Sequence, residues 1–188
     1  AHNLKASKEQ ILDDLKGFMS PLQRRMLKEL LQHLDELNVH IENLNDEIDN
    51  FMKPEEKQAS QVIQDVTGIG NTSAQTIIAV IGTDMERFPS DRHISSWAGL
   101  CPGDNVSAKK RKSGKIRKGN ALLKSTLVLC AHAAVRHKSS YFHAQFKRIS
   151  THRGKKRAYV AVAHSILIAI YHILKDGVKY QDLGAEYY

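Results

Sequence analysis

The chain has 188 residues, a formal net charge of +8 and 41% hydrophobic residues. This length and apolar content suit one compact domain with an accessory element. The two cysteines, Cys101 and Cys130, form no CxxC pair, which argues against a zinc site or a disulfide framework and fits a reducing compartment. No signal peptide is visible, and no membrane-spanning segment is expected.

Charge divides the chain into two parts. Residues 1–66 carry 8 lysines and arginines against 13 aspartates and glutamates, whereas residues 67–188 carry 20 against 7. A strongly basic part is typical of a polyanion-binding protein, and nucleic acid is the commonest polyanion. We therefore predict a helical, coiled-coil oligomerisation segment over residues 1–54 and a compact binding domain over residues 55–188.

Two helices are predicted in the acidic part. Ser7 and Gln10 form a capping box that opens a short helix. Ser20 then caps a long helix over residues 20–53, with Pro21 in its first position. The apolar residues of this helix alternate in steps of three and four, which is a heptad seam: Leu27, Leu30, Leu34, Leu37, Ile41, Leu44, Ile48 and Phe51.

The heptad seam has two interpretations. It packs within its own domain, or it forms a coiled coil that joins subunits or pairs with the first predicted helix. Acidic residues flank the seam, so this part of the chain is not expected to contact DNA. We favour the intermolecular coiled coil, which predicts a homo-oligomer formed through residues 20–53.

The basic part is predicted to be helical, because no run of residues alternates as a strand does. Phe88, Trp97 and Leu100 are expected in the core. The fold class is therefore all-α: a long heptad helix followed by a compact multi-helix domain. The expected helices cover residues 55–66, 72–82, 91–100, 120–137, 141–149 and 158–174.

Residues 66–74 resemble a helix-hairpin-helix motif. Gly68 and Gly70 would let the backbone approach a phosphate, and the next helix would offer free N–H groups. The alternative is a tight turn between two packed helices that binds no ligand. We call residues 67–70, of sequence Thr-Gly-Ile-Gly, the glycine turn.

Residues 107–120, called the basic segment below, form the electrostatic centre of the chain. Ser107 opens it, either as a nucleophile on DNA or as a polar residue of a phosphate-binding loop. Each phosphate neutralised by the segment would release counterions, so binding should weaken with salt. The alternative is a solvated loop. The candidate nucleic-acid contacts are Lys109, Lys110, Arg111, Lys112, Lys115, Arg117, Lys118 and Asn120.

A second basic patch covers residues 152–157, just before the last predicted helix. Its candidate phosphate contacts are Arg153, Lys155, Lys156 and Arg157. A solvated helix cap is the alternative. The ten histidines form no HExxH motif, and no metal site is predicted in this chain.

Several motifs follow one another in a specific order: VTGIG, RFPS, SWAGLCPG, Ser107, SGKIRKGN and HRGKKR. This order resembles the C-terminal transposase domain of the Piv-like DEDD transposases and invertases of bacterial insertion sequences. That family includes bridge-RNA-guided recombinases. The resemblance covers roughly residues 60–180, and the heptad helix resembles the family's middle segment.

The resemblance implies a composite active site. In the family, a RuvC-like N-terminal domain holds Mg²⁺ with four acidic residues, and a C-terminal serine attacks DNA to form a phosphoserine link. Ser107 matches that serine; it is followed by Ala108, where many relatives have glycine, and Ser113 falls at a variable position. The RuvC-like domain is expected to lie outside this sequence, so the chain would hold half of the site and no metal.

The resemblance therefore implies a DNA transposase or recombinase of the bacterial cytoplasm, acting at the nucleoid. Its expected partners are DNA and a guide RNA, and the fragment alone is expected to be inactive. One alternative is a non-catalytic helix-hairpin-helix module that binds nucleic acid. Another is an oligomerisation scaffold built on the heptad helix.

Overall fold

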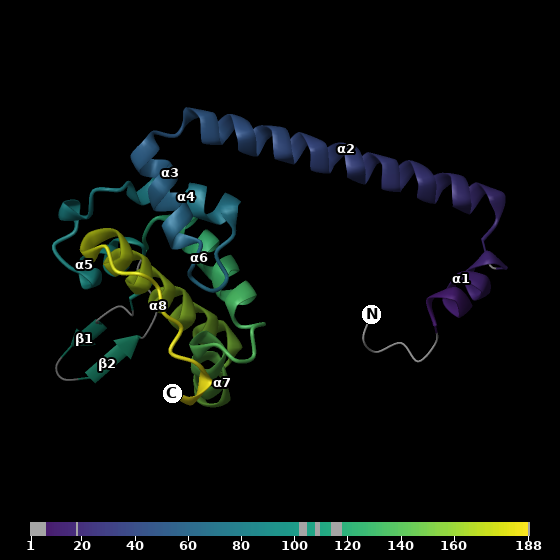
Figure 1. Ribbon diagram of the computed structural model, residues 1–188. Helices are drawn as coiled ribbons and strands as arrows, with labels where there is room; N and C mark the ends of the chain where they lie inside the picture. Colours follow the sequence, from purple (N-terminus) through teal and green to yellow (C-terminus); the bar gives the residue numbers. More distant parts are fainter. Residues whose placement is uncertain (1–6, 18, 102–104, 108–109, 114–117, 188) are drawn as a thin grey trace. The chain divides into compact units, whose positions relative to one another are not determined.

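The computed structural model describes residues 7–17, 19–101, 105–107, 110–113 and 118–187 (Figure 1). The chain forms two compact units, Ala1–Phe51 and Met52–Tyr188. The break lies close to the predicted domain boundary between residues 54 and 55.

The first unit contains the two predicted helices, α1 (Lys8–Lys16) and α2 (Pro21–Phe51). Both capping boxes are present. The Gln10 N–H donates to Ser7 Oγ at 3.2 Å, and the Ser7 N–H donates back to Gln10 Oε1 at 3.0 Å. Ser20 and Gln23 make the same reciprocal pair at 3.3 and 2.8 Å. These bonds satisfy N–H groups that a helix start leaves open.

The apolar seam of α2 is exposed along its whole length. No residue of α2 is buried, and even Phe51 at its end is 89% exposed. Packing of the seam within its own unit, one of the two interpretations, is therefore not found among the described residues.

The second unit is helical, as predicted. In chain order its elements are α3 (Pro54–Ile63), α4 (Asn71–Ile81), the 3₁₀ turn η1 (Met85–Arg87), α5 (Asp91–Trp97), β1 (Asn105–Ser107), β2 (Lys110–Ser113), α6 (Ala121–Ala134), α7 (Tyr141–Arg153), α8 (Lys155–Asp176) and η2 (Ala185–Tyr187). The two short strands were not predicted. They escape a search for alternation because β2, with the sequence KRKS, contains no apolar residue.

Helix α8 is the central element of this unit. It packs against α3, α5, α6, α7 and η1 (Figure 1). Its buried face includes Val162, Ile166 and Ile170, and Tyr171 Oη donates a hydrogen bond to the Phe88 carbonyl at 3.0 Å. By length and composition alone α8 could cross a membrane, contrary to expectation, but here it is the core helix of the unit.

Two other expectations were wrong. Trp97 is 41% exposed instead of buried, although its ring still contacts Phe88 at a centroid distance of 5.5 Å. Helix α7 continues to Arg153, and α8 begins at Lys155. The second basic patch is therefore the end of one helix and the start of the next, where a loop before a helix had been expected.

Candidate nucleic-acid interface

The glycine turn connects α3 to α4 and rests on α6. Gly68 has a φ of +95°, and a Cβ atom on it would lie 2.5 Å from the Cys130 carbonyl oxygen and 2.7 Å from Ala134 Cβ. Glycine is therefore required here so that the turn can touch the helix backbone. The structure gives Gly68 a packing role, and its predicted contact with a phosphate stays a prediction.

Gly70 is different, because it faces open space. It is exposed, and no atom lies within 4 Å of a Cβ placed on it. It is the N-cap residue of α4, and no side chain caps the helix there. The next two residues, Asn71 and Thr72, are also exposed. The start of α4 thus offers backbone N–H groups to solvent, as an anion site requires.

Buried residues hold α4 in place behind this open end. Ala74, Ile77 and Ile78 of α4 are all buried. On α6, Cys130 is buried as well, and burial raises the pKa of its thiol. The cysteine therefore acts as a small core residue.

The C-terminal tail, residues 177–187, connects the glycine turn to the start of α7 through hydrogen bonds to Asp182. Asp182 accepts four hydrogen bonds, from the N–H groups of Tyr141 and Gly184, both at 2.8 Å, and from the hydroxyls of Thr67 at 3.2 Å and Tyr180 at 3.4 Å. Partial burial acts against its charge, but these hydrogen bonds outweigh it and lower the pKa of Asp182. Burial raises the pKa of Tyr180 to about 12.

Strands β1 and β2, residues 105–107 and 110–113, pair antiparallel and are together called the basic hairpin. Its register pairs Ser107 with Lys110, Val106 with Arg111 and Asn105 with Ser113. An irregularity between Asn105 and Val106 leaves Lys112 as an extra residue on β2. Ser107 is thus the last residue of β1, and the opposite strand, β2, contains Lys110, Arg111 and Lys112. Lys109, Lys115 and Arg117 lie outside the described residues.

The chain segments on either side of the basic hairpin, residues 97–99 and 119–120, lie in contact and are called the roots of the hairpin. A Cβ on Gly119 would lie 2.3 Å from the Gly99 nitrogen and 2.5 Å from the Ala98 carbonyl carbon. The Asn120 N–H also donates to the Trp97 carbonyl at 3.3 Å. Gly119 therefore allows two backbone segments to cross.

Asn120 and Lys118 differ in role at this root. The Asn120 side chain accepts a hydrogen bond from the Leu123 N–H at 2.9 Å and so caps α6. This capping role explains the residue without a nucleic-acid contact. Lys118 is exposed and remains available to a phosphate.

The second basic patch is fully exposed. Arg153, Lys155, Lys156 and Arg157 all lie on the surface, around Gly154, where α7 ends and α8 begins. The first turn of α8 contains no acidic residue. Positive side chains at a helix start are unfavourable because that end already carries partial positive charge. An anion bound there would relieve this repulsion.

Contacts along α6 show which candidates lie together. The glycine turn contacts the C-terminal half of α6, and Tyr159, one turn after Lys155, stacks on His132 of the same half. The roots of the basic hairpin lie at the other end of α6, beside its N-cap. Since α6 has 14 residues, the two ends are about 20 Å apart.

Sequence reasoning missed a third basic group between α6 and α7. Arg136, His137 and Lys138 are exposed and follow directly after the part of α6 that contacts the glycine turn. One signal could have revealed them: no aspartate or glutamate occurs between residues 105 and 175. The positive field therefore spans α6, α7 and nearly all of α8, beyond the two patches that were chosen.

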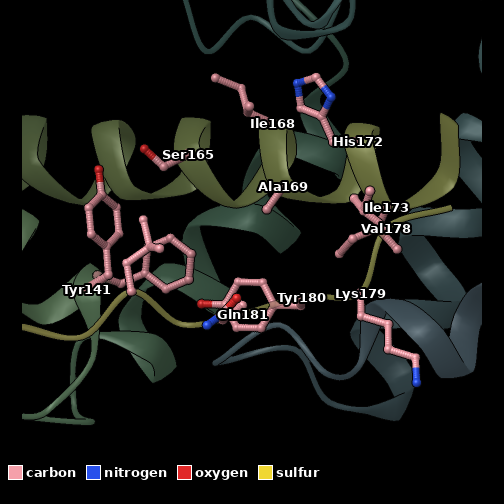
Figure 2. A pocket seen from close by; sticks show the side chains of 12 residues that line it. Tyr141, Ser165, Ile168, Ala169, His172, Ile173, Val178, Lys179, Tyr180 and Gln181 are labelled. Carbon is pink, nitrogen blue, oxygen red and sulfur yellow. The ribbon is translucent and has the colours of Figure 1, made fainter. Parts of the chain in front are cut away.

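A surface pocket of about 400 Å³ lies between α8, the start of α7 and the C-terminal tail (Figure 2). Figure 2 shows Tyr141, Ser165, His172 and Tyr180 around it. Its lining is mostly apolar, and none of the predicted site residues belongs to it. Within the described residues, no three His, Cys, Asp or Glu side chains gather as a metal site would require.

Comparisons with known proteins find similarity to transposases of insertion sequences. Residues 60–147 match the family described as Transposase IS116/IS110/IS902. The match includes the glycine turn, Ser107 and Asn120, and it ends before the second basic patch.

Individual relatives show the same similarity. The transposase for insertion sequence element IS1111A of Coxiella burnetii is 30% identical over 125 residues, which cover 64% of this chain and 34% of the relative. The insertion element IS110 uncharacterized 43.6 kDa protein of Streptomyces coelicolor is 28% identical over 135 residues, 68% of this chain and 31% of the relative. A putative transposase of Sinorhizobium fredii is 26% identical over 133 residues, with 66% and 33% covered. The chain spans about a third of the length of these relatives.

Proposed function

We propose that this chain is part of a DNA transposase, in which residues 52–188 bind DNA and supply Ser107 as the nucleophile for strand cleavage and exchange. The observation that carries the proposal is the family match over residues 60–147, which contains Ser107. The basic hairpin supports the proposal, because its register pairs Ser107 with Lys110. The same strand also contains Arg111 and Lys112.

The proposed chemistry is a transesterification. The Ser107 oxygen bonds to the phosphorus, the bond from phosphorus to a deoxyribose oxygen breaks, and the serine proton passes to that released oxygen, which becomes a hydroxyl. The number of phosphodiester bonds is conserved, so strands can be resealed without another energy source. Nearby lysine and arginine charges would stabilise the negative charge that develops on the attacked phosphate.

A serine hydroxyl is a weak nucleophile and needs a base or a metal ion to activate it. The described residues of this chain offer no group of metal ligands, so we derive no step through an ion. Mg²⁺ remains part of the proposal only for segments of the longer relatives that this chain does not cover.

Mutation of the serine tests the catalytic part. In the full-length protein, Ser107→Ala should abolish strand exchange and the covalent protein–DNA adduct, while DNA binding survives. Ser113→Ala, a second serine of the same hairpin, is the matched control and should retain both activities. Wild-type strand exchange by Ser107→Ala would refute the assignment.

Non-catalytic binding is the second candidate function. It is favoured by the open start of α4 and the exposed second basic patch, which need no reaction to explain them. Binding of duplex DNA by the 188-residue chain should weaken with salt. Removing the three charges of Lys155, Lys156 and Arg157 should reduce the slope of log affinity against log salt by about three.

A bridge RNA and a homo-oligomer belong to the same proposal. RNA carries the same phosphate charges as DNA, so an RNA should compete for the basic surface.

The exposed apolar seam of α2 would be buried in a coiled coil between copies of the chain. Analytical ultracentrifugation should show an oligomer that Leu34→Glu dissociates; a monomeric wild-type chain would contradict this part. Action at the bacterial nucleoid follows from the DNA-binding proposal, and a chain that does not bind DNA would contradict both.

A further inference from the structure

Three aromatic rings meet beside the second basic patch. Tyr159 of α8 stacks on His132 of α6, with ring centroids 3.6 Å apart and planes 22° apart. Phe146 of α7 contacts the same tyrosine at 4.5 Å. His132 is exposed, whereas Tyr159 and Phe146 are half-buried. Tyr159 covers one face of the His132 imidazole. The solvent-exposed part of His132 is therefore the edge of its ring and the opposite face.

The exposed imidazole lies close to positive charge. Lys155 and Lys156 precede Tyr159 by four and three residues on α8, so they share its side of the helix. Both lysines are exposed. No carboxylate occurs in the sequence of α6, α7 or α8 before Asp176, so no acidic neighbour on these helices offsets the two charges.

We propose that His132 is a stacking site for one unpaired base, with Lys155 and Lys156 contacting the phosphates on either side of it. The inference rests on the proposed nucleic-acid binding and names the form of nucleic acid that this face takes. An exposed ring next to cations is the arrangement that binds single strands, because every base has a flat face and every linkage a charge.

The same arrangement predicts that the His132 site binds single strands and not intact duplexes. Within a duplex, each base stacks on its neighbours, and its faces are not available to a protein ring. The His132 site would therefore take a base at a strand end, a nick or an opened junction, and leave binding of intact duplex to the phosphate contacts alone.

Fluorescence of 2-aminopurine provides the test. A short single-stranded DNA with one 2-aminopurine and the duplex of the same sequence are titrated with the 188-residue chain. In wild type, stacking should quench the fluorescence of the single strand. His132→Ala should weaken single-strand binding about ten-fold and remove the quenching, while duplex affinity stays unchanged. His132→Phe keeps a ring without the imidazole and should retain both signals.

His172→Ala is the matched control. His172 is an exposed histidine of α8 that lies outside the basic patches and pairs with Asp176 at 2.7 Å, so its loss changes the same residue type and should leave quenching and affinity unchanged. Thermal melting of each variant checks the fold, and His132→Phe keeps the test decisive if His132→Ala does not fold.

Each result has a defined meaning. Unchanged quenching in His132→Ala, with duplex binding intact, would overturn the stacking site and leave the proposed function standing. Equal losses for both DNAs would make His132 a general contact and would also overturn it. If the wild-type chain binds neither DNA, the proposed function fails together with the inference.

Discussion

The two ends of α6 are each fixed by a glycine that leaves no room for a methyl group, but they fix different things. At the C-terminal end, Gly68 seats the glycine turn against Cys130 and Ala134; at the N-terminal end, Gly119 crosses the backbone at Ala98 and holds the roots of the basic hairpin. Gly68 and Gly119 touch the backbone of another segment and so position the candidate contacts. Gly70 and Lys118 are exposed and are the groups that can meet a phosphate.

The largest expected effect is that of Gly68→Ala. Its positive φ costs about 1–2 kcal/mol for a residue with a side chain, and the new methyl group would clash with a carbonyl 2.5 Å away, an overpacking that costs about 1–3 kcal/mol more. We expect the free energy of unfolding to fall by about 3 kcal/mol. Urea denaturation measures this, and a change below about 1 kcal/mol would contradict the packing role.

Gly119→Ala should have a smaller effect on stability and a larger one on the hairpin. Its backbone is not in the left-handed region, so only the clash with Gly99 applies. We expect a loss of about 2 kcal/mol. Because the roots of the hairpin must part, limited proteolysis should cut residues 105–113 faster than in Gly68→Ala. Equal cutting rates would mean that the crossing does not hold the hairpin.

Asp182→Asn tests how the tail holds the glycine turn. The folded pKa of Asp182 lies below its ordinary value of 3.8, so the carboxylate stabilises the fold above that value and ceases to do so as pH falls through the folded pKa. At neutral pH we expect a loss of about 1 kcal/mol, less than its hydrogen bonds would sum to, since solvent screens the exposed group. Denaturation at several pH values should show the difference closing in acid.

Asp176→Asn is the control for this experiment. Asp176 pairs with His172 at 2.7 Å, and both side chains are 48% exposed. The charge change is the same, but the pair lies within one helix on the surface and should contribute little. Equal losses in the two variants would show that the glycine turn does not depend on the tail.

Much of the fold could be predicted from the sequence, because local signals set it. Ser7, Ser20 and Pro21 mark helix starts by chemistry that acts within four residues. Gly177, with a φ of +65°, ends α8 in the left-handed conformation that glycine adopts readily. The anchors of α4 also follow from helical periodicity.

What the sequence did not reveal depends on distant contacts. A glycine that permits mobility and one that permits a backbone crossing look the same in sequence, so the role of Gly119 needed Ala98 and Gly99 in place. The exposure of Trp97 and the capping role of Asn120 are likewise set by neighbours in space. For the candidate site, the glycine turn was predicted from its motif and the second basic patch from its charge, whereas Arg136 and Lys138 became candidates only once α6 was seen against the turn.

Gly70→Ala should change stability least, and it decides between the two interpretations of the glycine turn. No atom lies within 4 Å of the new methyl group, and alanine in place of glycine at a helix N-cap costs less than about 1 kcal/mol. If the start of α4 binds a phosphate, the methyl group stands between them, and duplex affinity should fall while unfolding is nearly unchanged. Gly68→Ala should show the reverse: a large loss of stability, with affinity retained wherever the protein is still folded. If Gly70→Ala lowers neither quantity, the turn joins two packed helices and contacts no ligand, and DNA binding then depends on the basic hairpin and the second basic patch.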